Sequence, residues 1–409
     1  MFMENRYDKY KDSGIAWIGE IPEHWKVKKG KNLFKKEERS VRDNDEIVTC
    51  FRDGEVTLRS NRRIDGFTNA MKEVGYQGVR RGDLVIHNMD AFAGAIGVSD
   101  SDGKSTPVYS VCTPKNNVEA NVYYYAYLLR SYALGGVIQS LAKGIRERST
   151  DFRYKEFGDL YYQQPPIEEQ QSIASYLDQK CGEIDKLITL QEEMITKLQS
   201  YKQSVITEAV TKGLDKNVPL KDSGIEWIGE IPEHWSVVKI KYLAKIKSGD
   251  SISSNEIMQE GIYEVYGGNG LMGFCNKKNV DGVNIIIGRV GALCGNVRLI
   301  SESKFITDNA LILNCFDNAL YSYMYIMLKA ANLNNLNTSN AQPLITGSKV
   351  LNVSLPIPPL SEQQSIADYL DQKCSEIDEL ISIKQQKIEK LKDYKKSLIF
   401  ECVTGKRKV

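Results

Sequence analysis

The chain has 409 residues, and its 54 Lys and Arg against 53 Asp and Glu leave a net charge of +1, which gives no global sign of a nucleic-acid partner. Hydrophobic residues make up 42% and charged residues 26%, values that are typical of a globular protein and exclude wholesale disorder. No apolar run approaches the roughly 20 residues that span a bilayer, and the N-terminal stretch MFMENRYDKY lacks the apolar core of a signal peptide. We therefore expect a cytoplasmic protein with no membrane segment.

Two blocks of sequence occur twice. Residues 12–25, DSGIAWIGEIPEHW, return at 222–235 with one difference, and residues 169–188, EQQSIASYLDQKCGEIDKLI, return at 362–381 with 17 of 20 positions identical. The offsets are 210 and 193, so the material between the blocks is 17 residues shorter in the second copy. The chain is two tandem copies of one unit, in which near-identical frames enclose interiors that have diverged.

The first block of each copy reads as turns and short extended pieces, because its Gly and Pro residues would interrupt a helix. It holds all four tryptophans of the chain, which we expect to pin the start of each domain onto its core: Trp17, Trp25, Trp227 and Trp235. His24 and His234 have no second histidine, cysteine or carboxylate at ligand spacing. We expect these two residues to pack or cap and not to catalyse.

Both interiors show the same order of short β-like runs followed by one helix. The patterns predict strands at 46–51, 83–87, 263–266, 284–288 and 310–314, and helices at 122–134 and near 320–331. Tyrosines on these helices could stack on nucleic-acid bases. Their helical spacing within an apolar segment favours core packing instead.

Each interior closes with a proline-rich strip that leads into a helix of about 44 residues, roughly 66 Å long. Ser361 and Gln364 have the spacing of a capping box, which predicts the start of the second helix. Apolar residues at heptad positions a, d and e indicate a coiled coil in which the two copies pair antiparallel. Lys180 and Lys373 at one d position make this seam imperfect, which leaves part of the stripe for another subunit. The residues expected at the coiled-coil or subunit interface are Ile173, Leu177, Ile184, Leu187, Met194, Leu198, Tyr201, Ile366, Leu370, Ile377, Leu380, Leu391 and Tyr394.

The predicted fold class is α+β: two tandem mixed α/β recognition domains separated by two long helices that form an antiparallel coiled coil, with a pseudo-two-fold internal repeat. The N-terminal segment and first recognition domain are expected at 1–164, the first long helix at 165–215, the second recognition domain at 216–357 and the second long helix at 358–409. Two like domains held at opposite ends of such helices suit a two-part target.

A search for catalytic motifs is negative. DGKST at 102–106 lacks the glycine that a phosphate-binding loop needs five positions before Gly103, and YGGNG at 266–270 lies in no βαβ pattern. There is no G-x-S-x-G and no H-E-x-x-H, and three histidines leave little scope for acid–base chemistry. The eight cysteines are scattered singly, with no C-x-x-C pair. We predict no catalytic residue and no bound metal.

The interiors do offer hydrogen-bonding side chains in loops flanked by glycine. Arg can read guanine and Asn or Gln can read adenine in the DNA major groove, at about 1–3 kcal/mol of discrimination for each bidentate contact. Any one of these residues could equally cap a turn. An excess of 15 Lys and Arg over nine Asp and Glu between residues 26 and 81 is a weaker pointer to phosphate binding. The candidate DNA-contacting residues are Arg52, Arg59, Asn61, Arg62, Arg63, Arg146, Arg148, Arg153, Asn269, Arg289, Asn296, Asn337, Asn340 and Gln342.

Three motifs carry a family resemblance. They are DSGIEWIGEIPEHW at 222–235, IIIGRVGALCGNV at 285–297 followed by TDNA, and PIPPLSEQQSIADYL at 356–370. Through them the chain resembles the DNA-specificity subunits of type I restriction–modification systems, over both repeats and essentially the whole length.

The resemblance implies two target-recognition domains, each reading one half of a split, asymmetric sequence in double-stranded DNA, with coiled-coil regions that fix the spacer between the halves. It implies two modification subunits, which carry S-adenosylmethionine and methylate adenine, and restriction subunits that complete an ATP-dependent nuclease. The chain itself would bind no cofactor, because S-adenosylmethionine, ATP and Mg are expected on the partner subunits.

Two other classes of function remain open from the residues. Near-neutral charge favours a coiled-coil scaffold whose paired domains bind proteins and not DNA. An enzyme such as a nuclease could lie within the divergent interiors, although the paired carboxylate–lysine constellation of a nuclease is missing. The family resemblance weighs against both.

Overall fold

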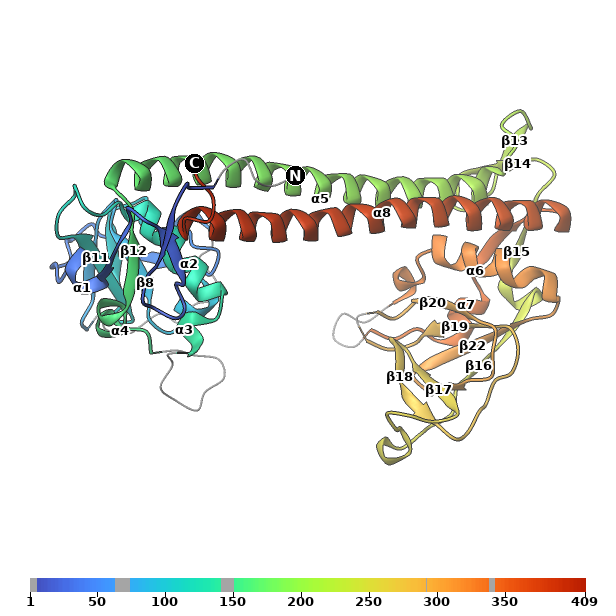
Figure 1. Ribbon diagram of the computed structural model, residues 1–409. Helices are drawn as coiled ribbons and strands as arrows, with labels where there is room; N and C mark the ends of the chain where they lie inside the picture. Colours follow the sequence, from blue (N-terminus) through green and yellow to red (C-terminus); the bar gives the residue numbers. More distant parts are fainter. Residues whose placement is uncertain (1–5, 63–73, 141–150, 292, 338–342) are drawn as a thin grey trace. The chain divides into compact units, whose positions relative to one another are not determined.

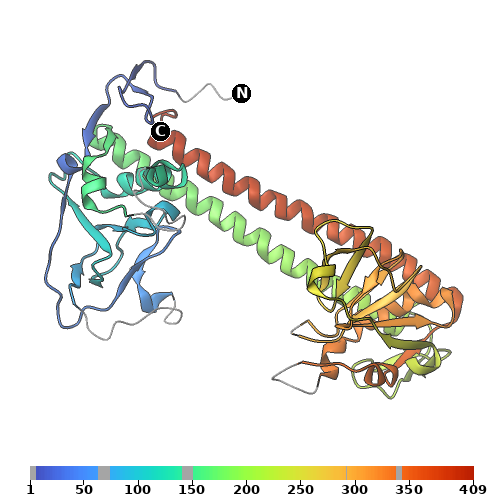
Figure 2. The same ribbon diagram turned by 90° about the horizontal axis from the view of Figure 1, so that it is seen from below.

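The computed structural model describes residues 6–62, 74–140, 151–291, 293–337 and 343–409. Two compact units make up the chain (Figures 1 and 2): unit 1 holds residues 1–191 and 386–409, and unit 2 holds residues 192–385. Each unit therefore contains one segment from each of the two long helices. In the described part of the chain, none of the helices combines the length and the apolar character needed to cross a membrane.

The central sheet of unit 1 has four antiparallel strands in the order β4-β11-β8-β9, and three two-stranded ladders, β10-β7, β12-β3 and β5-β6, surround it. A further hairpin, β1-β2, opens the unit. The strands of unit 1 are β1 (Tyr10–Asp12), β2 (Glu20–Pro22), β3 (Lys26–Lys29), β4 (Phe34–Lys36), β5 (Val48–Cys50), β6 (Val56–Leu58), β7 (Gln77–Val79), β8 (Leu84–His87), β9 (Ile96–Val98), β10 (Gly103–Ser105), β11 (Tyr109–Pro114) and β12 (Tyr161–Gln164).

The principal helix packed on this sheet is α2, and its bounds match the predicted helix. Asn121 caps its start, since the side-chain oxygen accepts the backbone N–H groups of Tyr123 and Tyr124. Tyr124 and Tyr125 are fully buried, whereas Tyr123 is exposed, so core packing is confirmed for the buried pair. The helices that begin in unit 1 are α1 (Gly30–Leu33), α2 (Val122–Leu134), α3 (Val137–Ser140), α4 (Tyr154–Asp159) and α5 (Ile167–Lys212), with 3-10 turns at Arg59–Asn61 and Ala91–Ala93.

Unit 2 has a central sheet of the same design, in the order β16-β22-β19-β20, together with a three-stranded sheet β18-β17-β21 that unit 1 lacks among its described residues. Its strands are β13 (Leu220–Asp222), β14 (Glu230–Pro232), β15 (Ser236–Lys239), β16 (Ala244–Ser248), β17 (Tyr263–Gly267), β18 (Gly270–Cys275), β19 (Asn284–Gly288), β20 (Val297–Ile300), β21 (Phe305–Ile306), β22 (Ala310–Cys315) and β23 (Ser354–Ile357). Its helices are α6 (Tyr321–Ala330), α7 (Gly347–Leu351) and α8 (Leu360–Val403), with 3-10 turns at Ile240–Tyr242, Ser254–Glu256, Asn318–Leu320 and Leu333–Leu336.

In both units the main hydrophobic core includes segments of the long helices, which pack directly under the sheet and its helix. Burial of these apolar side chains at roughly 25 cal/mol per Å² ties each helix segment to its unit. The buried helix residues in the two clusters are Ile173, Ala174, Leu177, Ile184, Leu398, Cys402 and Val403 in unit 1, and Val205, Ala209, Val210, Ile366 and Leu370 in unit 2.

Within each unit the two helix segments run antiparallel. In unit 1, Lys395 Nζ lies 2.7 Å from the carboxylate of Asp185. In unit 2, Lys202 Nζ lies 2.6 Å from Asp378, and Lys384 Nζ lies 3.2 Å from Met194 Sδ. Such exposed ion pairs contribute at most about 1 kcal/mol each, so the packing of apolar side chains holds the segments together.

Two predictions about the frame are wrong. The capping box does not form, because α8 already begins at Leu360: the N–H groups of Glu362 and Gln363 bond to the carbonyl of Pro359. The tryptophans are not all core residues. Trp25 and Trp235 are at most 1% exposed, but Trp17 and Trp227 are 43% and 40% exposed.

Candidate nucleic-acid interface

The two repeated blocks touch one another at the base of each unit. In unit 1, the Trp25 indole Nε1 donates to Glu169 Oε2 at 3.0 Å, and Tyr7 donates its hydroxyl to the same oxygen at 2.9 Å. His24 Nε2 lies 2.6 Å from the other oxygen, Oε1. The histidine therefore takes part in a structural contact, as expected.

Unit 2 repeats this contact. The indole of Trp235 donates to Glu362 Oε2 at 2.9 Å, and His234 Nε2 lies 2.6 Å from Oε1. Each glutamate belongs to the first turn of a long helix, where the helix dipole also favours a negative charge. The contact between the two blocks explains why both are nearly identical in the two copies: a change in either block would disturb its contact with the other.

A third repeat completes the frame, and the sequence analysis missed it. The end of α5 reads EAVTKG at 208–213 and the end of α8 reads ECVTGK at 401–406. Gly213 and Gly405 both end their helices with positive φ, +74° and +75°, and pack against the buried tryptophan of the first block. The sequence signal for this third repeat is the match of Glu208, Val210 and Thr211 to Glu401, Val403 and Thr404 at the offset of 193, which is too short to be recognised by itself.

Above this frame, four candidate residues of unit 2 gather at one edge of the sheet, where β19 ends and β22 begins. Gly288 at the end of β19 donates its N–H to the carbonyl of Asn296 at 2.8 Å, and Arg289 donates its N–H to the carbonyl of Asn309 at 3.0 Å. The Arg289 carbonyl in turn accepts from Ile345 at 2.9 Å. Three stretches far apart in the sequence thus meet around Arg289.

The two other candidates join the same edge. Asn337 Oδ1 accepts the N–H of Leu344, which precedes the segment bonded to Arg289. Asn269 is exposed in the β17–β18 turn beside Gly268, where a Cβ would lie 2.6 Å from the Asn309 carbonyl. Only glycine lets this turn approach so closely. The edge thus presents amide and guanidinium groups on a rigid backbone.

Arg289 has hydrogen-bonding capacity to spare at this edge. Its guanidinium bonds weakly to Ser248 Oγ at 3.4 Å, and its Nε is buried without an acceptor among the described residues. A buried donor without a partner costs free energy of about 1–3 kcal/mol. An acceptor on a ligand at this edge would remove that cost.

The corresponding edge of unit 1, after β8 and before β11, also carries candidates. Arg52 is exposed and pairs with Asp90 at 2.9 Å. A neighbouring cavity of about 610 Å³ is lined by Asn88, Tyr109 and Arg153, together with two lysines. This is a cationic, amide-bearing pocket at the same place in the fold as the polar edge of unit 2.

Three other candidates of unit 1 are engaged within their own hairpin. Arg62 pairs with Asp53 at 2.6 Å and Glu55 at 3.0 Å. Arg59 and Asn61 hydrogen-bond to threonine side chains of the β5–β6 hairpin. The structure does not bring Arg62 to the edge with a free guanidinium. Five candidates lie outside the described residues: Arg63, Arg146, Arg148, Asn340 and Gln342.

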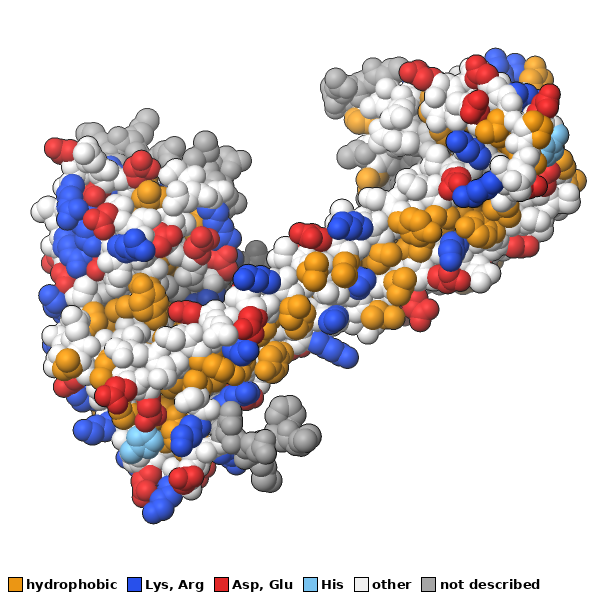
Figure 3. Space-filling view, turned by 90° about the horizontal axis from the view of Figure 1, so that it is seen from above, with side chains coloured by type: hydrophobic (Ala, Val, Ile, Leu, Met, Phe, Trp, Pro, Cys, Tyr) orange, Lys and Arg blue, Asp and Glu red, His pale blue; other side chains and the backbone are white. Residues whose placement is uncertain are grey.

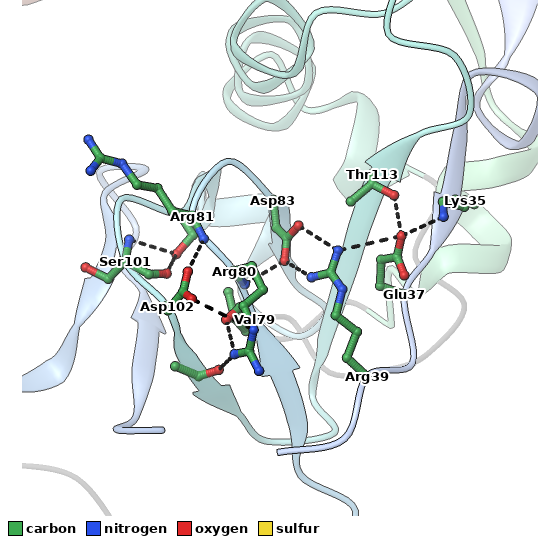
Figure 4. A network of polar contacts seen from close by, with 12 residues as sticks. Lys35, Glu37, Arg39, Val79, Arg80, Arg81, Asp83, Ser101, Asp102 and Thr113 are labelled. Carbon is green, nitrogen blue, oxygen red and sulfur yellow. Dashed lines mark hydrogen bonds and ion pairs between the residues drawn. The ribbon is translucent and has the colours of Figure 1, made fainter. Parts of the chain in front are cut away.

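The basic excess between residues 26 and 81 is largely neutralised within unit 1 (Figure 4). Arg39 pairs with Asp83, and Arg80 lies 3.0 Å from Asp45. The side chain of Arg81 points away from this network. Among the described residues of this stretch, these arginines hold turns together through ion pairs.

The expected interface residues of the helices divide into two groups. Ile173, Leu177, Ile184, Ile366, Leu370 and Ile377 are buried within their units, and Leu198 and Leu391 are half-buried. Leu187, Met194, Tyr201, Leu380 and Tyr394 are 37–52% exposed. The heptad pattern predicted which helix positions are apolar. It did not predict which of these side chains are buried within the chain and which are exposed.

The exposed group forms two equivalent surfaces on the helices, where apolar side chains gather in Figure 3. We define helix patch 1, in unit 1, as Leu187, Leu190 and Tyr394, and helix patch 2, in unit 2, as Leu380, Ile383 and Tyr201. Their members correspond through the offset of 193. Paired exposed apolar surfaces mark protein–protein contact sites.

Among the residues described, no group of three or more His, Cys, Asp or Glu side chains could hold a metal ion. Among their described residues, the polar edges contain Arg, Asn and Tyr side chains. Their chemistry is that of recognition by hydrogen bonds.

Comparison with known proteins agrees with this geometry. Solved chains of the type I restriction–modification class share the fold: one, from a study of complex assembly and conformational transition of the type I R-M system, superposes with a TM-score of 0.75 at 17% identity, covering 94% of this chain and 98% of that one. The HsdS subunit from Thermoanaerobacter tengcongensis gives a TM-score of 0.55 at 18% identity, with the same coverage.

Sequence comparison points to the same class of protein. The model of the type I restriction modification DNA specificity domain matches residues 232–393. The type I restriction enzyme MjaX specificity subunit of Methanocaldococcus jannaschii is 27% identical over 96% of both chains, and the MjaVIII specificity subunit of the same organism is 26% identical over 72% of both. The chain is similar to the specificity subunits of type I restriction–modification systems along nearly its whole length, and residues 232–393 match their DNA specificity domain.

Proposed function

We propose that the chain gives a type I restriction–modification complex its DNA sequence specificity by reading a split target, one half with each unit. The observation that carries this proposal is the combination of like frames and unlike edges. Both units have the same central sheet and the same Trp–Glu contact. At the equivalent edge, unit 1 presents Arg52 and Arg153 while unit 2 presents Asn269, Arg289 and Asn296.

These edges would read bases in the major groove of double-stranded DNA. Arg is suited to guanine O6 and N7, and Asn to adenine N6 and N7. The two edges therefore read different half-sites. The cations that line the unit 1 cavity, Lys36, Arg153 and Lys155, would contact phosphates and supply salt-dependent affinity, which leaves Arg52 to read a base.

The long helices would form an antiparallel coiled coil that sets the spacing between the half-sites. Antiparallel contacts within each unit, Lys395 to Asp185 and Lys202 to Asp378, support this arrangement. A separation of about one turn of DNA, roughly 34 Å, lies within the reach of helices of 46 and 44 residues.

Helix patches 1 and 2 would each bind one modification subunit. The two patches have corresponding residues, so they fit two copies of one partner. S-adenosylmethionine would be bound by those subunits, and ATP and Mg by restriction subunits, while this chain would hold none of them. The assembly would act on DNA in the cytoplasm.

Methylation mapping tests this function. The chain is co-expressed with its modification subunit, and genomic DNA is compared with DNA from cells that lack the chain. A split motif that is methylated only when the chain is present is the expected result. A stable complex without any chain-dependent motif would favour the alternative, a scaffold whose paired domains bind proteins.

A chain with two copies of the unit 1 interior tests whether each unit reads one half-site. Residues 236–357 are replaced by a second copy of residues 26–164, so that both frames hold the same interior. The methylated motif should then contain the first half-site twice. Persistence of the second half-site would show that the interior of unit 2 does not read it.

A further inference from the structure

The hairpin that opens each unit carries an exposed tryptophan. We name residues 12–23 of unit 1 and 222–233 of unit 2 the tryptophan turns. Trp17 is 43% exposed and Trp227 is 40% exposed, although the isoleucine after each is only 7% exposed. In Figure 1 the β13–β14 turn projects from unit 2 on the side away from β17 and β18. The turn thus lies away from the β17–β18 turn that carries Asn269.

Local structure explains part of the identity between the two turns. Asp12 accepts the N–H of Gly14 at 2.9 Å, and the equivalent bond in unit 2 is also 2.9 Å. Gly14 and Gly19 have φ of +74° and +69°, a region that favours glycine, and their equivalents have +69° and +68°. The aspartate and both glycines are therefore needed for the shape of the turn.

The same reasoning does not explain three exposed residues that are identical in both turns. Glu20 and Glu23, like their equivalents in unit 2, are exposed, and their side chains have no hydrogen bond or ion pair within the described part of the chain. Trp17 is also too exposed for packing within the chain to require a tryptophan at this position. Recent duplication does not explain the identity either, because the interiors have diverged. The unexplained pairs are Trp17 and Trp227, Glu20 and Glu230, and Glu23 and Glu233.

The chemistry of the turns selects the kind of partner. The unit 2 turn carries Asp222, Glu226, Glu230 and Glu233, the unit 1 turn carries Asp12, Glu20 and Glu23, and neither turn contains Lys or Arg. This negative charge would repel DNA phosphates. An exposed indole on the same turn as several carboxylates fits an apolar pocket with a Lys or Arg rim on a protein. Tryptophan is also among the residues most enriched at the centres of interfaces.

We propose that each tryptophan turn is a docking anchor for one modification subunit, with the indole of Trp17 or Trp227 seated in a pocket whose basic rim pairs with the glutamates. This inference rests on the proposed function for the identity of the partner. Two turns that differ only at Ala16 and Glu226 fit two copies of the same partner, as the two helix patches do.

Each turn adjoins the start of a long helix that also carries the helix patch of its own unit. Trp25, which ends the first block, holds Glu169 in the first turn of α5. Leu190 of helix patch 1 lies 21 residues further on, three heptads, and so faces the same side of the helix. Glu362 and Ile383 have the same spacing in unit 2. One subunit could therefore cover the turn and the patch together.

The test uses the full chain with the modification subunit. Trp17→Ala, Trp227→Ala and the double variant are titrated with that subunit, and native mass spectrometry counts the bound copies. Each single variant should retain one tight copy and bind the other about 30-fold more weakly, the loss that truncation of a hot-spot tryptophan typically causes. In the double variant both copies should be weakened.

Tyr242→Ala is the matched control, because Tyr242 is a 68% exposed aromatic outside the turns. It should leave both affinities unchanged, and thermal unfolding of all variants should match the wild type, since each site is exposed. Unchanged binding of both copies by the double variant would overturn the inference, as would loss of the restriction subunit alone. The proposed function fails separately, when the wild-type complex yields no chain-dependent methylation motif.

Discussion

The indole Nε1 of Trp25 lies 3.0 Å from Oε2 of Glu169, and the same pair returns in unit 2 as Trp235 and Glu362 at 2.9 Å. The contact joins the first repeated block to the second. It explains why both blocks are retained in each copy, because a change in either residue would leave the buried indole or the charged carboxylate of the other without its hydrogen-bond partner. The interiors take no part in this contact and are free to differ.

The carboxylate of Glu169 should stabilise unit 1 in a pH-dependent way. Burial alone would raise the pKa of Glu169, but hydrogen bonds from Trp25, His24 and Tyr7 outweigh it and lower the pKa below the usual value of 4.5. A lowered folded-state pKa means that the stability is present above about pH 4.5 and is lost as the pH falls through the folded-state value.

Glu169→Gln should therefore lower the free energy of unfolding by about 2 kcal/mol at pH 7, because a charged acceptor is replaced by a neutral one. Urea unfolding from pH 7 to pH 3 measures this effect, and the difference between variant and wild type should shrink below pH 4.5. Glu168→Gln, at an exposed neighbouring position, is the control. A difference that stays constant with pH would remove the carboxylate from the explanation.

Charges on the helices should have opposite effects at neighbouring positions. Leu187 is 45% exposed in helix patch 1, whereas Ile184 is 5% exposed in the core of unit 1. Leu187→Glu should change the free energy of unfolding by no more than about 0.5 kcal/mol and should release one modification subunit. Ile184→Glu should unfold unit 1, because it buries a charge.

Native mass spectrometry and thermal melts of the two variants separate these outcomes. Leu380→Glu, the equivalent change in helix patch 2, should release the other copy. Two bound copies in the Leu187→Glu complex would show that helix patch 1 is not a subunit contact.

Much of the fold could be predicted from local pattern. The strand at Asn284–Gly288 and the helix at Val122–Leu134 have the predicted bounds, because a continuous apolar run and a helical apolar spacing each specify one local structure. The exposure of Leu187 and Trp17 could not be predicted. The spacing of apolar residues identifies a surface whose burial would be favourable. Only the tertiary packing shows whether the chain itself buries that surface.

The site was only partly predictable for a related reason. The chemistry of Asn and Arg side chains singled out Arg289, Asn296 and Asn269, but they come from separate stretches that only the sheet brings together. The same chemistry selected Arg62, which is instead paired with Asp53 and Glu55. Residue type predicts what a side chain can bind, and neighbours in the fold decide whether it is available.

The edge of unit 1 should contribute phosphate contacts through Arg153. Its side chain is 68% exposed and, among the described residues, it forms an ion pair with exposed Asp151, so it can exchange this weak pair for a phosphate. Arg153→Ala should weaken DNA binding and reduce the slope of log affinity against log salt by about 1. Fluorescence anisotropy of the assembled complex on target DNA from 50 to 200 mM salt, roughly the range over which such contacts are lost, measures this slope.

Arg81→Ala is the matched control for that experiment. Arg81 is also an exposed arginine, but it precedes the start of β8, at the opposite end of the strand from the proposed interface. It should leave the slope unchanged. Equal reductions for both arginines would mean that DNA does not approach unit 1 specifically at the edge after β8.

Asn296 should read a base in one half-site only. Its side chain is exposed, while its carbonyl accepts the N–H of Gly288 at 2.8 Å, so the backbone stays in place when the side chain is removed. Asn296→Ala should therefore leave stability unchanged. It should cost about 1–3 kcal/mol of discrimination at one base pair, or roughly fivefold to 150-fold.

Methylation mapping of cells that carry this variant gives the result at every genomic site. The second half-site should become degenerate at one position, and the half-site read by unit 1 should stay as it is. Asn217→Ala, an exposed asparagine before β13, is the control and should change neither half. If Asn296→Ala weakens methylation equally at all sites without relaxing any position, then the Asn296 amide contacts the DNA backbone, because phosphate contacts fix position but carry no sequence information.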